Sequence, residues 1–222
     1  MKQCVSMLAL AAAAGVAHAD LISEWNFNAS NTTPSTGAGV ASLIGGTTAT
    51  FASGTGSSDL GLPNSAWNTT TYPAQGTGSG TAGAMFMVDT TMFEDITVEF
   101  DHRQSNTASR FLALEYTLDG GSSWTAANVF EATLGGAIWH NDRLTDLSAI
   151  AGADNNPNFG FRIVSIFAPS TGAYTAAQPG STYGVSGTIR FDMVQVSGSK
   201  VPAPGSLALL GLGGLLAARR RR

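Results

Sequence analysis

The sequence is poor in cysteine, in charged side chains and in helical patterning, and each shortage excludes a class of structure or function. Its single cysteine, Cys4, lies near the N-terminus, so disulfides and thiolate metal sites are excluded from the rest of the chain. Charged residues make up 12% of the chain, and no nucleophile, zinc-protease or nucleotide-binding motif accompanies them. No stretch of residues 20–200 shows a sustained 3.6-residue repeat of apolar side chains, which argues against a helical domain.

The N-terminus has the features of a secretory signal peptide. Lys2 supplies a positive charge and an apolar stretch follows it. Ala17 and Ala19 flank one residue in a small-x-small cleavage site immediately before Asp20. We therefore expect the Sec machinery and signal peptidase as partners. The mature chain is expected to begin at Asp20 and to contain no cysteine.

Charge is distributed unevenly along the chain. Residues 20–200 hold all fifteen acidic residues but only six of the basic ones, so their net charge is −9, against −4 for the whole chain. An acidic domain does not favour contact with the phosphate backbone, so no nucleic-acid partner is expected. It is compatible with divalent cations or with neutral glycans.

Alternating apolar and polar residues predict several strands. The opening strand is predicted at 21–27, further strands at 96–101, 112–118 and 159–163, and a central closing strand at 189–196. Gly, Asn and Asp clusters separate these runs, whereas residues 28–83 indicate weak strands joined by long loops. The fold class that follows is all-β, an antiparallel β-sandwich of the jelly-roll kind.

The C-terminus is built in three parts. A Pro-containing motif precedes the Gly/Leu/Ala-rich run 205–218, and an arginine cluster ends the chain. An apolar helix over 201–218 would be roughly 27 Å long against a hydrocarbon core of about 30 Å, so one short hydrophobic helix could just cross a bilayer. The residues of the two flanking motifs are Val201, Pro202, Ala203, Pro204, Arg219, Arg220, Arg221 and Arg222.

This layout resembles the PEP-CTERM sorting signal, which exosortase recognises. Position 203 is Ala where that family most often has Glu. The resemblance implies transient membrane anchoring through the tail, sorting by exosortase, and final placement at the cell surface or in the extracellular matrix with exopolysaccharide. A plain C-terminal membrane anchor is the alternative. The domains predicted are a signal peptide at 1–19, a secreted β-sandwich at 20–200 and a sorting signal at 201–222.

One internal motif resembles the Asp-box turn of sialidase-like propellers. Thr117, Asp119, Gly121 and Trp124 fit its pattern of Ser/Thr-x-Asp-x-Gly-x-x-Trp. The motif occurs once, without the repeats of a propeller, so a local structural turn is expected with Trp124 closing the end of the core. Sugar stacking on Trp124 is the alternative.

A structural calcium site is a second hypothesis. Glu24 and Asn26, followed by Asn28, carry oxygen ligands at every second position near the start of the domain, and Asp192 lies in the closing strand. Such oxygens suit a hard cation. The alternative is that Asp192 is simply exposed.

Trp67 and Trp139 are the aromatic side chains predicted to contact a ligand, although either could be a core residue.

The leading hypothesis is a non-catalytic exported surface protein, adhesive or structural, with glycan binding as one expectation. The runner-up is an extracellular glycoside hydrolase or lyase that uses the carboxylates of Glu99, Asp101 and Glu115. A third reading is an anchored structural protein without a specific ligand. The two histidines of the domain, His102 and His140, are predicted at the surface or at an interface.

Overall fold

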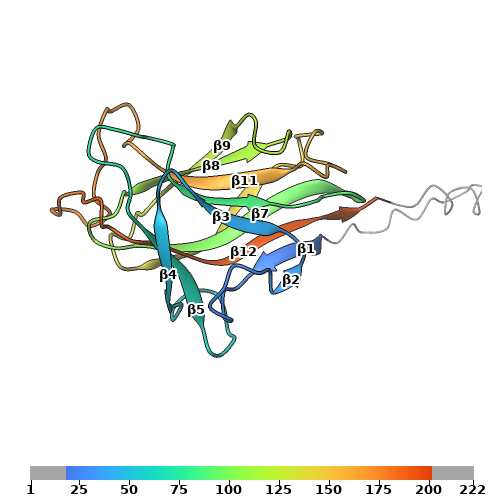
Figure 1. The fold of residues 1–222 in the computed structure, drawn as a ribbon, viewed down its shortest axis with the longest axis horizontal. Coiled ribbons are helices and arrows are strands. Elements are labelled where there is room, and N and C mark those ends of the chain that lie inside the picture. The colour runs from blue at the N-terminus through green and yellow to red at the C-terminus, as the bar shows by residue number, and fades with distance from the viewer. Residues whose placement is uncertain (1–18, 202–222) are drawn as a thin grey trace, which may run out of the picture.

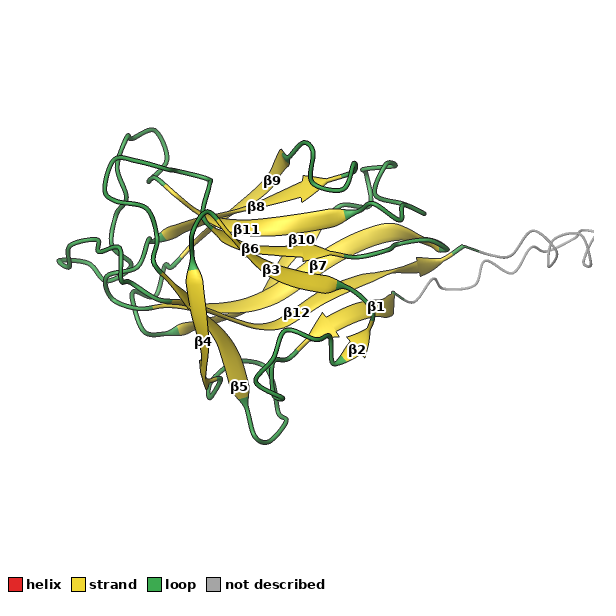
Figure 2. Cartoon of the chain, in the orientation of Figure 1, coloured by secondary structure: helices red, strands yellow, loops and turns green. Residues whose placement is uncertain are grey.

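The computed structural model describes residues 19–201, which consist of strands and loops with no helix among them (Figure 2). Within that range, therefore, no helix is long and apolar enough to cross a membrane. The predicted signal peptide and the predicted C-terminal hydrophobic helix with its arginine cluster lie outside the described residues. The first strand begins at Asp20 and the last ends at Lys200.

Twelve strands of the described chain form two antiparallel sheets, which lie against each other as a sandwich (Figure 1). The seven-stranded sheet contains β1 (Asp20–Trp25), β2 (Thr36–Gly37), β4 (Thr48–Ser53), β5 (Ser65–Thr70), β7 (Phe93–Gln104), β10 (Trp139–Asp146) and β12 (Ile189–Lys200). The five-stranded sheet contains β3 (Val40–Ile44), β6 (Gly83–Met87), β8 (Phe111–Thr117), β9 (Thr125–Glu131) and β11 (Gly160–Ile166). The predicted fold class, an antiparallel β-sandwich, is confirmed.

The closing strand β12 occupies the centre of the seven-stranded sheet. It pairs with β7 along one side and with β1 and then β5 along the other. Asp20 at the start of β1 lies opposite Gly198 near the end of β12. The two ends of the described domain therefore lie side by side (Figure 1).

The alternation of apolar and polar residues along the predicted strands matches the alternation of buried and exposed side chains in the structure. In β7, Ile96, Val98 and Phe100 are fully buried, whereas Thr97 and Glu99 between them are partly exposed. Three strands were not predicted, namely β6, β9 and β10. β9 and β10 are the outermost strands of their sheets, where half-covered side chains leave a weaker apolar pattern.

The core that joins the two sheets is centred on an aromatic cluster. Phe86 of the five-stranded sheet stacks on Phe161 at 5.0 Å between ring centroids. It also meets Trp25 and Trp67 of the opposite sheet edge-on, at 5.1 and 6.1 Å. All four rings are buried. Edge-to-face and offset contacts at these separations are favourable, so this cluster fixes how the sheets lie on each other.

Replacement of Phe86 by alanine is expected to lower the free energy of unfolding by about 3–5 kcal/mol, because it leaves a cavity between the sheets. Urea unfolding curves measure this. The control is Leu60→Ala, since Leu60 is 96% exposed and its truncation should change stability by no more than about 0.5 kcal/mol. Equal effects of the two substitutions would contradict the central place given to Phe86.

Candidate binding groove

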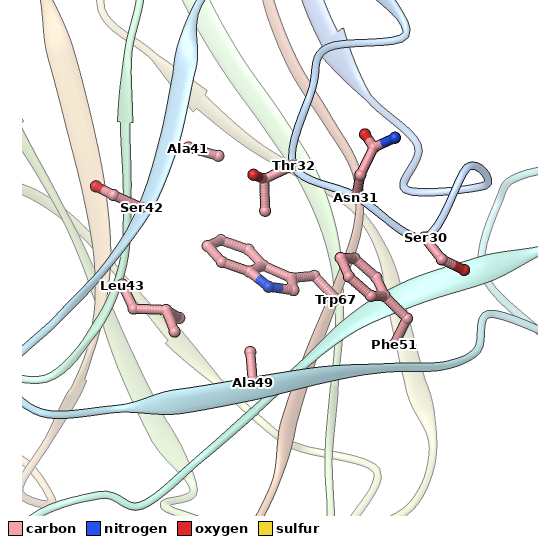
Figure 3. Close-up of a pocket in the computed structure, with 9 residues that line it drawn as sticks. All are labelled: Ser30, Asn31, Thr32, Ala41, Ser42, Leu43, Ala49, Phe51 and Trp67. Carbon is pink, nitrogen blue, oxygen red and sulfur yellow. The ribbon is translucent and has the colours of Figure 1, made fainter.

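A groove of about 520 Å³ lies at the open edge of the sandwich (Figure 3). Short polar side chains and apolar side chains line it, and none of the lining residues is charged. The indole of Trp67 lies in the middle of the lining residues in Figure 3. The lining residues are Ser30, Asn31, Thr32, Ala41, Ser42, Leu43, Ala49, Phe51 and Trp67.

The groove exists because consecutive strands belong to different sheets. β3 lies in the five-stranded sheet and β4 in the seven-stranded sheet, and the short connection 45–47 joins them. Ala41 is paired with buried Phe86, and Phe51 is paired with buried Trp67. In Figure 1, β4 runs steeply across the direction of β3. The groove is therefore the part of the sandwich interior that stays uncovered where two edge strands diverge.

Hydrogen bonds hold both ends of the groove. At the connection between β3 and β4, the Thr47 hydroxyl lies 3.0 Å from the carbonyl oxygens of Ile44 and Gly83. At the other end, the Trp25 indole N–H donates to the Thr32 carbonyl at 3.0 Å. The Asn31 side-chain oxygen accepts the Thr33 N–H at 2.9 Å.

Trp67 provides a fixed aromatic floor. Its ring stacks on Phe27 at 5.6 Å between centroids, and Phe27 in turn meets Phe51 at 6.4 Å. Trp67 is only 3% exposed, so only a small part of its indole is accessible from the groove. A preformed apolar floor with hydroxyl and amide groups near it suits a small neutral molecule.

The other predicted ligand residue, Trp139, lies elsewhere. Its indole N–H donates to the Thr55 carbonyl at 2.9 Å, and its ring lies beside Gly56. Trp139 therefore supports the β4–β5 connection, residues 54–64, and does not line the groove. The contributions of Ser30, Thr32 and Phe51 could not be predicted from the sequence, because short polar segments and single aromatic residues carry no distinctive pattern.

The β4–β5 connection covers two carboxylates on the outer face of the seven-stranded sheet. The Ser57 hydroxyl donates to Asp192 Oδ2 at 2.7 Å, and the Ser58 N–H donates to Asp101 Oδ2 at 2.5 Å. Asp101 and Asp192 are opposite each other on β7 and β12, and both are fully buried. Asp101, one of the carboxylates considered for hydrolysis, is therefore covered by this connection and shielded from water.

Burial of these carboxylates raises their pKa values. Desolvation raises the pKa of Asp192 to about 7, and the neighbouring charges of Asp59 and Asp101 add to the shift. Desolvation likewise raises the pKa of Asp101. Glu99 has a pKa raised mainly by desolvation, with smaller contributions from Asp142 and Asp101.

The residues predicted to bind calcium have hydrogen-bond partners of their own. Glu24 accepts the Ser35 hydroxyl at 2.8 Å and the Gln195 amide at 2.9 Å. The Asn26 side-chain oxygen accepts a backbone N–H at 3.2 Å, and Asp192 is held as described above. Among residues 19–201, no group of three or more His, Cys, Asp or Glu side chains is arranged to hold a metal ion. Calcium at Glu24, Asn26 and Asp192 stays a prediction from the sequence.

The carboxylates predicted for hydrolysis lie on different sheets. Glu99 and Asp101 belong to β7 of the seven-stranded sheet, whereas Glu115 belongs to β8 of the five-stranded sheet. Glu115 forms an ion pair with Arg162 at 2.5 Å. The structure therefore does not gather the three carboxylates into one site.

The two histidines are buried, so their predicted place at the surface is wrong. His102 and His140 lie opposite each other on β7 and β10, with ring centroids 5.0 Å apart. His102 Nδ1 lies 2.8 Å from the side-chain oxygen of Gln104. Desolvation, with smaller contributions from His140 and Arg143, lowers the pKa of His102 to about 3. His102 is therefore neutral at physiological pH and is part of the core.

The Asp-box residues form a hydrogen-bonded turn between β8 and β9. The Thr117 hydroxyl donates to Asp119 Oδ1 at 2.7 Å, and the same oxygen accepts the Ser123 N–H at 2.9 Å. Hydrogen bonds from Ser123 and Thr117 lower the pKa of Asp119 to about 2. Gly121 has a φ of 94°, a conformation that favours glycine.

Trp124, the last residue of that motif, does not close the end of the core. It is partly exposed, and the Arg162 guanidinium lies 4.6 Å from its ring centroid. Arg162 itself pairs with Glu115. The indole is therefore engaged in a cation–π contact on the five-stranded sheet.

The PEP-CTERM protein-sorting motif matches residues 200–222. The chain carries a PEP-CTERM sorting signal. The resemblance read from Val201 to Arg222 is thereby confirmed, with Ala203 in place of the usual Glu. The motif indicates a secreted surface protein sorted by exosortase.

No curated protein matches this PEP-CTERM chain. Several solved structures are similar to it at low sequence identity. The tandem CBM22-1–CBM22-2 domain of Xyn10C from Paenibacillus barcinonensis is 12% identical, with a TM-score of 0.48 over 87% of this chain and 48% of that one. The chain thus spans about half the length of that tandem structure.

Two further structures are similar at this level. The family 11 carbohydrate-binding module from Clostridium thermocellum, solved with a β-1,3-1,4-mixed-linked tetrasaccharide, is 9% identical with a TM-score of 0.42, over 82% of this chain and all of that one. The K1 cleaved adhesin domain of Lys-gingipain from Porphyromonas gingivalis W83 is 12% identical with a TM-score of 0.39, over 75% of this chain and all of that one. With TM-scores below 0.5, these likenesses carry no functional inference.

The buried Asp192 of this PEP-CTERM protein should make its stability depend on pH. Because the pKa in the folded state is about 7 and the ordinary pKa is about 4, the folded state binds this proton more tightly. The contribution of Asp192 to the free energy of unfolding is therefore most favourable below pH 4 and is lost as the pH rises to 7. Asp192→Asn is expected to melt above the wild type at pH 8 and close to it at pH 4, measured by thermal unfolding. The control is Asp95→Asn at an exposed position; an equal gain there would contradict the assignment.

Proposed function

We propose that this PEP-CTERM protein is a non-catalytic cell-surface or extracellular-matrix protein that binds neutral glycan in the groove between β3, β4 and β5. The observation that carries the proposal is the uncharged lining of the groove around the aromatic floor of Trp67. The sorting motif indicates a secreted surface protein, and extracellular glycans are accessible to a protein at that location.

The chemistry of the groove supports a saccharide ligand. The apolar C–H face of a sugar ring packs on aromatic side chains, and here the partly exposed ring of Phe51 and the small accessible part of Trp67 present such surface. The hydroxyls of Ser30 and Thr32 and the amide of Asn31 lie at the side of the groove, where they match sugar hydroxyls. The net charge of −9 over residues 20–200 disfavours polyanionic polysaccharides.

The same lining supports the proposal of a non-catalytic role. Glycoside hydrolysis ordinarily uses two carboxyl groups about 5–10 Å apart beside the scissile bond. The groove contains no carboxylate. Bound saccharide would therefore be held without being cleaved.

Filling the groove should abolish glycan binding. Ala49 lines the groove on β4, so Ala49→Phe places a ring where the ligand would lie. Isothermal titration with neutral oligosaccharides is expected to show at least about a tenfold loss of affinity, or about 1.4 kcal/mol. The matched control is Thr50→Phe, because the adjacent residue of a strand faces the opposite side. Equal loss in both variants would place the binding elsewhere.

Saccharides that bind should be recovered uncleaved. Incubation of the protein with each bound polysaccharide is expected to release no reducing ends above the level of a heat-denatured control. Release that disappears on Glu99→Gln would instead establish the hydrolase alternative. Release that persists in that variant but disappears on Asp101→Asn would point to the buried carboxylate.

A further inference from the structure

We propose that the groove recognises the end or a short branch of a neutral glycan, not the middle of a long chain. This inference rests on the proposed function and adds the mode of binding. An internal segment of a polysaccharide needs a groove open at both ends, so that the chain can enter and leave. The strand pairing and the hydrogen bonds indicate that a backbone segment lies across each end of this groove.

One end is closed by the connection between β3 and β4. Ile44, the last residue of β3, is paired with Gly83, and the Thr47 hydroxyl lies 3.0 Å from the carbonyl of the same Gly83. Thr47 is itself buried. Because β3 and β4 are joined here by three residues, the groove narrows to the backbone of residues 45–47.

The segment 30–32 closes the opposite end. Ser30 Oγ lies 3.5 Å from Ser65 Oγ, and Ser65 is paired with Ser53 at the far end of β4. The Thr32 carbonyl accepts the indole N–H of Trp25. The ring of Trp25 also lies so close to Gly39, next to the start of β3, that a side chain at position 39 would collide with it. Segment 30–32 therefore spans from the end of β4 to the start of β3, across the wide side of the groove.

These walls are fixed by the fold. Trp25, which anchors segment 30–32, is fully buried and packs on Phe86. Moving the segment aside to let a chain pass would break the bond from the Trp25 indole and expose that ring. A saccharide therefore enters from the solvent side and ends inside the groove. The volume of about 520 Å³ lies in the lower part of the usual range for small-ligand pockets, about 300–1,000 Å³, which suits a short terminal segment.

The test measures affinity against chain length. The full protein is titrated with neutral gluco-, manno-, galacto- and xylo-oligosaccharides from disaccharide to hexasaccharide, and with the parent polysaccharides. For a ligand series that binds, the Kd is expected to tighten by less than about fivefold from trisaccharide to hexasaccharide, because added residues lie outside the groove. Tightening by more than about fivefold would overturn end recognition while leaving glycan binding in place.

A second measurement counts binding sites on the polymer. Mild cleavage of the polysaccharide by an endo-acting glycosidase creates new chain ends at constant mass. The amount of protein bound per mass of polymer is expected to rise with the number of ends. An unchanged or lower capacity would overturn the inference. Ala49→Phe should lose binding to oligomer and polymer alike, whereas Thr50→Phe should retain both. Failure of every saccharide to bind would refute the proposed function itself.

Discussion

The contact of Phe86 with Trp25 and Trp67 across the sandwich is the interaction on which the rest of the structure depends. It joins β6 of one sheet to β1 and β5 of the other, in the middle of the molecule. The same contact orients Trp67 as the floor of the groove and Trp25 as the anchor of segment 30–32. The same aromatic side chains therefore pack the core and support the groove, and the groove lies at the edge of the core where no strand covers it.

The outer face of the seven-stranded sheet also buries polar groups, namely two carboxylates. There the β4–β5 connection lies over β7 and β12 and buries Asp101 and Asp192 with hydrogen bonds from Ser57 and Ser58. None of the three ion pairs in the described chain involves these carboxylates. Burial without a cation is unfavourable to their charged forms, which is why their pKa values rise. The β4–β5 connection is thus held by two carboxylates whose negative charge is disfavoured by their burial on the sheet.

The strands that could be predicted from the sequence are those with one face in the packed interior and the other face toward solvent. β7 and β12 alternate clearly because one side of each faces the packed interior. β9 and β10 were missed because they are outer strands, and Val129 of β9 and Leu144 of β10 are about half exposed. The buried state of His102 and Asp101 could not be predicted either, since polar residues in a strand ordinarily mark its wet face. Their burial results from segments distant in sequence that fold over them.

The sequence by itself determined the sorting signal, the antiparallel β class and the absence of cysteine chemistry from the domain, because these depend on residues that are adjacent or regularly spaced. Only the tertiary structure decided where the groove lies. Its lining comes from segment 30–32, β3, β4 and Trp67, and these meet because β3 and β4 belong to different sheets. It also separated Trp67 from Trp139 and Glu115 from Glu99. Those relations depend on sheet assignment and strand order, which arise from long-range pairing that no local pattern encodes.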